Sequence, residues 1–262
     1  MEFDAIVYAG LFLVAALAGF IDAIAGGGGL LTTPALLFVG IPPINAIATN
    51  KLQSTLGTAM ATVNFARAGL LDWRAHRLTV AWVFAGSALG VLAVQQVDRS
   101  ALMLIIPVLL LAVAGYILLS PRMEDIDREP RLSERGYRPV AGAIGFYDGF
   151  FGPGTGSFLT TALVALFGMG LVSATAHTKF LNLSSNVAAL VTLVVGGYVL
   201  WVLGLLMAVA SVAGGQVGAH LALRVGSKVI RPLLVVMALA LTVKLLADPA
   251  NPLTAWVMGT HA

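Results

Sequence analysis

Cysteine is absent from the sequence, so disulfide bonds, thiolate metal ligands and thiol redox chemistry are excluded. Charge is scarce as well: 10% of the residues are Asp, Glu, Lys or Arg, whereas an average soluble domain has about 25%. In contrast, 59% of the residues are hydrophobic. Because a surface exposed to water cannot be built from so few charges, the composition indicates a membrane protein.

The apolar residues gather in runs long enough to cross a bilayer, which takes about 20 helical residues. Such runs are found at 5–25, 43–66, 78–95, 100–120, 171–196, 201–223 and 230–247. Strands of a membrane β-barrel would instead show segments of about 10 residues with alternating hydrophobicity. The sequence therefore predicts an all-α polytopic membrane protein.

The chain also repeats itself. The segment "GFIDAIAGG" at 19–27 returns 126 residues later as "GFYDGFFGP", and an offset of 128 residues then pairs Lys51 with Lys179 and Trp73 with Trp201. Chance similarity between apolar helices would match Leu and Ala rather than Asp, Lys and Trp. We therefore predict two transmembrane repeats, 1–120 and 139–262, joined by a charged linker at 121–138.

The distribution of basic residues indicates how the repeats are oriented, because Lys and Arg are enriched in cytoplasmic loops. This rule places the Arg-rich linker in the cytoplasm, together with the loop around Trp73, whose counterpart at 196–201 is uncharged. Conversely, the loop at Asp98 and Arg99 is nearly neutral, whereas its counterpart is basic. That counterpart contains Arg224, Lys228 and Arg231. The basic side changes between the halves, which predicts inverted-topology repeats of the kind found in secondary transporters.

Glycine-rich breaks interrupt the apolar pattern at matching places, 26–29 and 152–156. About fourteen residues precede the second break, a length of about 20 Å that is too short for a bilayer of about 30 Å. Each repeat is predicted to hold a Gly-broken re-entrant or short helix pair plus three full transmembrane helices. The alternative that both helices of the Gly-broken pair cross the membrane stays open. The helix after each break would present free N–H groups to an anion. A second group of glycines is predicted to allow close helix packing: Gly86, Gly90, Gly214 and Gly218.

Four ionisable residues remain inside the predicted membrane segments and form two repeat-related pairs, Asp22 with Asp148 and Lys51 with Lys179. Burying a charge at the centre of a membrane helix costs about 2.5–3.5 kcal/mol on insertion scales. We therefore expect all four at an inner site near the repeat interface. A structural alternative is that each lysine pairs with the aspartate of its own half, or extends to the membrane surface, and holds helices together. The two roles can coexist.

Neutral hydrogen-bonding residues accompany both lysines at helical spacing. An ammonium group with neutral donors suits the oxygens of a sulfonate, sulfite or carboxylate. The predicted substrate-binding residues are Gly26, Gly27, Gly28, Gly29, Asn50, Lys51, Ser54, Gly152, Gly154, Gly156, Thr178, Lys179 and Asn182.

Three further residues are predicted to tune the site or to carry a coupling proton. They are Asp22, Asp148 and His177, and for His177 a purely structural role is an equal alternative. No HExxH pattern or cluster of His, Asp and Glu indicates a metal site, and no P-loop or dinucleotide fingerprint is present. No metal and no cofactor are therefore predicted.

At these residues the sequence resembles the TauE/SafE sulfite exporter family of integral membrane transporters. The first copy of the pattern is "GFIDAIAGGGGLLTTPALLFVGIPPINAIATNKLQSTLGT" at 19–58, followed by "NFARAG" at 64–69. The second copy is "GFYDGFFGPGTGSF" at 145–158 with "ATAHTKFLNLSSN" at 174–186. The resemblance implies export or uptake of sulfite, sulfoacetate or other organosulfonates across a bacterial inner membrane. Thr178 stands where the first copy has Asn50, so the halves are chemically unequal.

We predict a secondary transporter of a small sulfur-containing or organic anion, with alternating access about a mid-membrane site. The alternative is an anion-selective channel or passive facilitator of the same fold. An intramembrane enzyme is disfavoured, because no nucleophile–base or metal set is found. The expected partners are the anion and the lipid bilayer. The net charge of +3 is assigned to cytoplasmic loops rather than to nucleic acid, and a coupling proton and a homodimer are left open.

Overall fold

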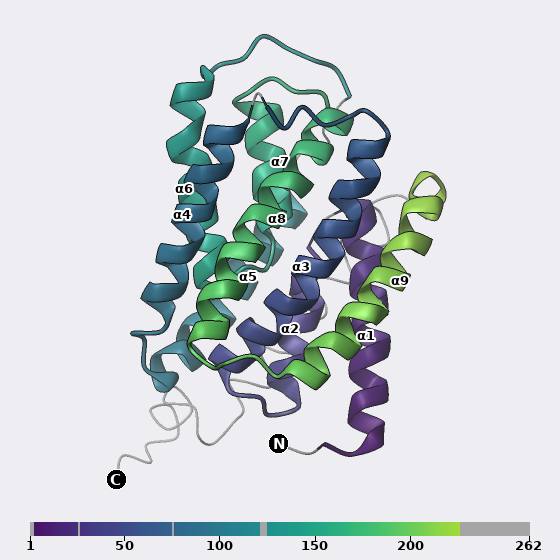
Figure 1. Ribbon diagram of the computed structural model, residues 1–262, viewed down its shortest axis with the longest axis vertical. Coiled ribbons are helices and arrows are strands. Elements are labelled where there is room, and N and C mark those ends of the chain that lie inside the picture. Colours follow the sequence, from purple (N-terminus) through teal and green to yellow (C-terminus); the bar gives the residue numbers. More distant parts are fainter. Residues whose placement is uncertain (1–2, 26, 75, 121–124, 226–262) are drawn as a thin grey trace.

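The computed structural model describes residues 3–25, 27–74, 76–120 and 125–225, and this part of the chain is helical throughout, without strands (Figure 1). The helices are α1 (Ala5–Ala25), α2 (Gly29–Phe38), α3 (Pro43–Arg67), α4 (Arg77–Val94), α5 (Arg99–Leu119), α6 (Glu134–Phe150), α7 (Thr155–Ala165), α8 (Leu171–Val195) and α9 (Trp201–Val225). The predicted all-α architecture is confirmed for the described residues. The predicted run at 230–247 lies outside them.

Five of these helices are long and apolar enough to cross a membrane: α1, α4, α5, α8 and α9. Helix α3 has 25 residues, but its central segment, "TNKLQST" at 49–55, is polar. Asn50 and Lys51 are nonetheless buried in the bundle. Polar residues at membrane depth are expected to face the bundle interior rather than lipid, and α3 follows this rule.

Helices α2 and α7 are the short elements that follow the two glycine breaks. They have 10 and 11 residues, a length of about 15 Å. Gly27 and Gly152 both have φ of 98°, a conformation that favours glycine and allows the chain to reverse. The end of α7 lies beside the linker that precedes α6, since the Leu166 carbonyl accepts hydrogen bonds from the N–H groups of Arg131 and Leu132. The start of α6 and the end of α7 therefore lie at the same end of the bundle (Figure 1).

Two long helix pairs, α4 with α6 and α1 with α9, pack through glycines. A Cβ added at Gly86 would overlap the carbonyl of Gly142, and one at Gly214 would overlap the carbonyl of Ala16. Gly218 also lies close to Phe20, since a Cβ added at Gly218 would lie 2.5 Å from the Phe20 carbonyl oxygen. The prediction that these glycines allow close helix packing is confirmed.

The two ends of the bundle differ in charge. At one end the α3–α4 loop meets the α7–α8 turn, where the His76 ring packs edge-on against Phe167, and Asp127 of the linker accepts a hydrogen bond from the N–H of Gly170. At the other end the Asn45 side chain donates to the Tyr198 carbonyl. The first end carries the described basic residues Arg67, Arg74, Arg77, Arg128, Arg131, Arg135 and Arg138. The opposite end carries Arg99, so the basic loops gather at one end (Figure 1).

Candidate substrate-binding site

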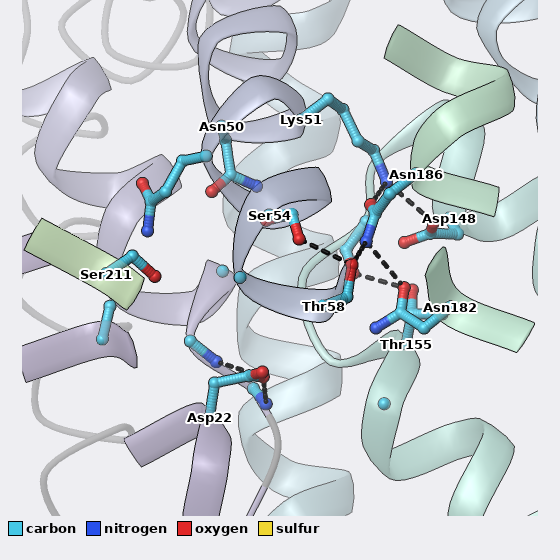
Figure 2. A pocket seen from close by; sticks show the side chains of 18 of the residues that line it. Asp22, Asn50, Lys51, Ser54, Thr58, Asp148, Thr155, Asn182, Asn186 and Ser211 are labelled. Atoms are coloured by element: carbon cyan, nitrogen blue, oxygen red, sulfur yellow. Dashed lines mark hydrogen bonds and ion pairs between the residues drawn. The ribbon is translucent and has the colours of Figure 1, made fainter. Parts of the chain in front are cut away.

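A small polar cavity lies where the starts of α2 and α7 meet the middle of α3 and α8 (Figure 2). Its volume is about 50 Å³. Among the residues named as candidates in the sequence, those that line it are Asp22, Gly27, Gly28, Gly29, Asn50, Lys51, Ser54, Asp148, Gly152, Gly154, Gly156 and Asn182. The tertiary structure therefore brings both glycine breaks to one cavity.

The Lys51 ammonium lies inside this cavity and forms a buried ion pair across the two halves of the chain. Its Nζ is 2.8 Å from Asp148 Oδ2, and the two side chains are 1% and 3% exposed. Lys51 also donates to the Asn186 side-chain oxygen at 3.1 Å (Figure 2). The backbone of Gly152 passes so close that an added Cβ would lie 3.0 Å from Nζ. Glycine at 152 thus leaves the room that the ammonium occupies.

A second ion pair joins the halves in the opposite sense. Lys179 Nζ lies 2.6 Å from Asp22 Oδ2 and donates to the Asp22 carbonyl oxygen at 2.9 Å. The Asp22 carboxylate also accepts hydrogen bonds from the N–H groups of Gly27 and Gly28 at 3.1 and 3.3 Å. The structural alternative, in which each lysine pairs with the aspartate of its own half or extends to the membrane surface, is therefore wrong as to the partner. Each pairs with the aspartate of the other half, because α3 and α8 cross at the centre of the bundle.

The polar partners of α3 and α8 differ at matching positions. Asn50 accepts a hydrogen bond from the Thr32 hydroxyl at 2.5 Å and lines the cavity. Its counterpart Thr178 instead accepts from the Thr160 hydroxyl at 3.0 Å and does not line the cavity. Gly26 lies outside the described residues.

His177 lies at the basic end of the bundle, away from the cavity. Its Nδ1 is 2.9 Å from the Ser173 carbonyl oxygen, and the Asp72 N–H donates to its Nε2 at 3.4 Å. Both ring nitrogens of His177 therefore contact backbone groups. Its ring packs edge-on against His76, with centroids 4.7 Å apart.

Several lining residues were not named from the sequence. Asn186 donates to the Asn182 side-chain oxygen at 3.1 Å and to the Thr58 hydroxyl at 3.5 Å (Figure 2). Asn186 follows Asn182 by four residues, so helical spacing could have identified it. Thr155 and Ser211, in contrast, reach the cavity from α7 and α9 and have no local signal.

The arrangement offers hydrogen-bond donors to a small polar ligand. The N–H groups of Leu30, Leu31 and Thr32 already donate to the carbonyls of Gly27 and Gly28, and those of Thr155 and Phe158 donate to Gly152 and Gly154. The starts of α2 and α7 therefore attract an anion mainly through the positive ends of their helix dipoles. The Lys51 ammonium and the amide of Asn186 add donors from the opposite side. The described part of the chain contains no group of three or more His, Asp or Glu that could hold a metal ion.

A second, mainly apolar cavity of about 330 Å³ adjoins the first, and we call it the vestibule. It shares Asp22, Gly57 and Ser211 with the polar cavity. Lys179 lines the vestibule rather than the polar cavity. From the shared residues the vestibule runs along α3 to Ala68 and Leu70, at the basic end of the bundle.

The long apolar helices, the interrupted helix pairs and the interior lysine–aspartate pairs together define a polytopic helical membrane protein with a polar site inside its bundle. The chain belongs to the TauE/SafE family, because the model described as "Sulfite exporter TauE/SafE" matches residues 11–245.

Similar curated proteins carry transporter names. The "Probable membrane transporter protein ORF9" of Sinorhizobium sp is 46% identical over 248 residues, covering 94% of this chain and 95% of its own. YfcA of Escherichia coli K12, also named a probable membrane transporter protein, is 45% identical and covers 91% of this chain and 89% of its own. A "Probable membrane transporter protein" of Haemophilus influenzae is 44% identical, with coverage of 91% and 94%. No solved structure matches the chain.

Proposed function

We propose that the protein is a secondary transporter of a small sulfur-containing or organic anion, with the polar cavity as its substrate site. The observation that carries this proposal is the Lys51 ammonium, 1% exposed, in a cavity lined by two interrupted helices. A buried charge inside a membrane bundle is costly and marks a functional site by default. The family description names sulfite export, and the relatives are named membrane transporters.

The proposed mechanism is alternating access between two inverted repeats, 1–120 and 139–262, joined by the linker at 121–138. Helices α1 and α2 would form a Gly-broken helix pair that enters from one side of the membrane, and α6 and α7 the matching pair from the other side. The exchanged pairs, Lys51–Asp148 and Lys179–Asp22, support this symmetry. The basic end, with the linker, would face the cytoplasm of a bacterial inner membrane.

Anion binding to Lys51 is proposed to accompany proton uptake at Asp148. An anion must compete with the Asp148 carboxylate, and breaking a buried pair leaves an uncompensated charge at a cost of about 3–5 kcal/mol. A proton on Asp148 removes that cost. The Oδ2 atom of Asp148 contacts Lys51 but accepts no well-aligned hydrogen bond from the described residues, whereas Asp22 accepts from two backbone N–H groups. Asp148 is therefore the carboxylate better suited to carry the proton.

The volume of the cavity favours a compact anion. A cavity needs at least about 10–15 Å³ to hold one water molecule, so a cavity of about 50 Å³ has room for only a small ligand. Sulfite, a sulfur atom with three oxygens, matches this size. Longer organosulfonates would extend their carbon chain into the vestibule.

The test is uptake of radiolabelled sulfite into vesicles that contain the purified protein. Lys51→Ala is expected to abolish uptake, and Arg99→Ala, which removes an exposed positive charge at the opposite end of the bundle, is the matched control. Uptake by Lys51→Ala at the wild-type rate would reject the site. Counterflow of unlabelled against labelled anion identifies a transporter, and its absence would favour the passive facilitator.

A further inference from the structure

The vestibule has a counterpart in the second half of the chain, and that counterpart is closed. The offset of 128 residues assigns Met60 to Ala188 and Ala61 to Ala189. Met60 is 40% exposed and lines the vestibule with Ala61, whereas Ala188 and Ala189 are 1% and 0% exposed. The same structural position is thus open to a cavity in one half and packed in the other.

The ion pairs at the inner ends of these two regions differ in the same way. Asp22 lines the vestibule and its side chain is 30% exposed, whereas the Asp148 side chain is 3% exposed. The two lysine side chains are both buried, 4% exposed for Lys179 and 1% for Lys51, but Lys179 lines the vestibule and Lys51 lines the polar cavity. The repeat therefore contains one open and one closed version of the same lysine–aspartate pair.

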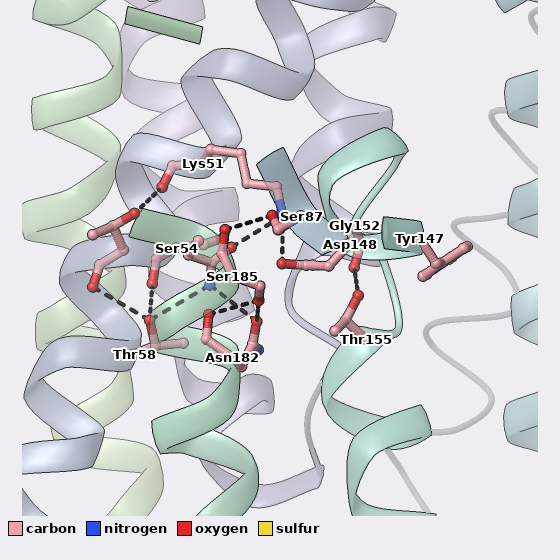
Figure 3. Close-up of polar contacts among 12 residues, drawn as sticks. Lys51, Ser54, Thr58, Ser87, Tyr147, Asp148, Gly152, Thr155, Asn182 and Ser185 are labelled. Atoms are coloured by element: carbon pink, nitrogen blue, oxygen red, sulfur yellow. Dashed lines mark hydrogen bonds and ion pairs between the residues drawn. The ribbon is translucent and has the colours of Figure 1, made fainter. Parts of the chain in front are cut away.

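Two hydrogen bonds hold the closed side. The Ser87 hydroxyl of α4 donates to the Ser185 carbonyl of α8 at 2.7 Å (Figure 3), and the Ser184 hydroxyl donates to the Val80 carbonyl at 3.1 Å. The open side has no equivalent hydroxyl, because Gly215 replaces Ser87 and Leu56 replaces Ser184. The sequence therefore gives the α4–α8 contact two side-chain hydrogen bonds that the α9–α3 contact lacks at the matching positions, and this makes the α4–α8 contact the more stable of the two.

From these observations we infer that the α4–α8 contact and the α9–α3 contact are the two gates of the pathway. In this conformation the α9–α3 gate is open, and the vestibule is the substrate entry from the basic, cytoplasmic end. The Ser87 hydroxyl is the positioning group that keeps the opposite gate shut. This inference rests on the proposed alternating access and adds which gate is open and which residues hold the other closed.

The absence of cysteine allows a direct test by single-cysteine labelling. Met60→Cys, Ala61→Cys, Ala188→Cys and Ala189→Cys are each treated with a membrane-impermeant maleimide in vesicles of known orientation. Arg74→Cys and Ser100→Cys, exposed at opposite ends of the bundle, report the sidedness of the reagent. Met60→Cys and Ala61→Cys are expected to react at least tenfold faster than their counterparts, and from the Arg74 side.

Introducing Ser87→Ala into the single-cysteine variants tests whether this hydroxyl keeps the α4–α8 gate closed. Labelling of Ala188→Cys from the Ser100 side should rise several-fold, while labelling of Met60→Cys falls. Ser184→Ala provides a second variant with the same expectation, should Ser87→Ala not fold. Equal reactivity of the paired positions, or no reciprocal change in both serine variants, would overturn the inference. Because labelling needs no substrate, its result is independent of the sulfite uptake that tests the proposed function.

Discussion

The two lysine–aspartate pairs occupy matching places in the two halves, but their surroundings differ. Lys51 and Asp148 are sealed among α3, α6 and α8, with Asn186 as the neighbouring acceptor. Lys179 and Asp22 border the vestibule, and two backbone N–H groups share the Asp22 carboxylate. Residues at matching positions of the two proposed repeats therefore have unequal environments, so the same residue type at a matching position does not fix its exposure.

This contrast has an electrostatic consequence. A charge in a sealed site depends on its partner, because little water can replace a lost ion pair. A charge beside an open cavity can be rehydrated, so its partner contributes less. The first pair should therefore dominate the stability of the bundle, and the second should tolerate changes.

The largest expected effect is from removing one aspartate at a time. Asp148→Ala should lower the free energy of unfolding by about 3–5 kcal/mol, because it leaves the Lys51 charge buried and unpaired. Asp22→Ala should cost about 1–2 kcal/mol, because the Lys179 ammonium can be hydrated from the vestibule. Denaturant unfolding in mild detergent measures both, with the exposed Asp98→Ala as control. Equal losses for the two aspartates would remove the contrast.

The α4–α6 and α1–α9 interfaces should, in contrast, lose similar stability when one of their glycines is replaced by alanine. Gly90→Ala and Gly214→Ala each place a Cβ against a backbone carbonyl, of Phe146 and Ala16 respectively. Both should lose about 1–3 kcal/mol through overpacking. Gly115→Ala is the control, since nothing lies within 4 Å of its added Cβ, and it should be neutral or slightly stabilising. Thermal unfolding of the purified variants measures the difference, and a loss confined to one interface would contradict the expectation.

A third prediction compares Asn50 with its counterpart Thr178. Asn50→Ala should weaken sulfite binding at least about tenfold, since a hydrogen bond to a charged group contributes about 1.5–3 kcal/mol. Thr178→Val keeps the shape of the side chain and should change the affinity by less than about twofold, because Thr178 bonds to Thr160 outside the cavity. Isothermal titration with sulfite gives both affinities. Equal weakening would mean that α8 turns Thr178 toward the ligand.

The smallest expected effect concerns pH at the basic end. Burial, and then the neighbouring His177, lower the pKa of His76, whereas Glu134 and Asp72 act in the opposite direction. The unfolded chain then binds more protons, so stability is complete above the ordinary pKa of about 6.5 and falls as the pH drops from there toward the lowered pKa. The His76→Phe variant keeps a ring against Phe167. Between pH 7.5 and pH 5.5 its melting temperature should fall by less than that of the wild-type protein. An identical loss in both proteins would exclude His76 as a source of acid sensitivity.

Much of the candidate site could be located from the sequence because its markers are local. Two glycine breaks and two isolated lysines stand out in apolar segments, and both breaks line one cavity with Lys51. The exchange of partners could not be foreseen, because two lysines and two aspartates allow either pairing. Helical spacing also grouped Thr178 with Lys179, but α8 directs Thr178 to α7 and presents Asn182 and Asn186 to the cavity.

The sequence by itself determined the helical class, the places where helices break and the residues whose burial demands a partner. These features follow from hydropathy, backbone sterics and the cost of charge in an apolar medium, all of which act over short stretches of chain. Only the tertiary structure decided that each lysine crosses to the other half, and that Asp22 borders an open vestibule while Asp148 is sealed. The reason is that the exposure of a side chain depends on how whole helices pack against one another, which involves contacts between segments far apart in the sequence.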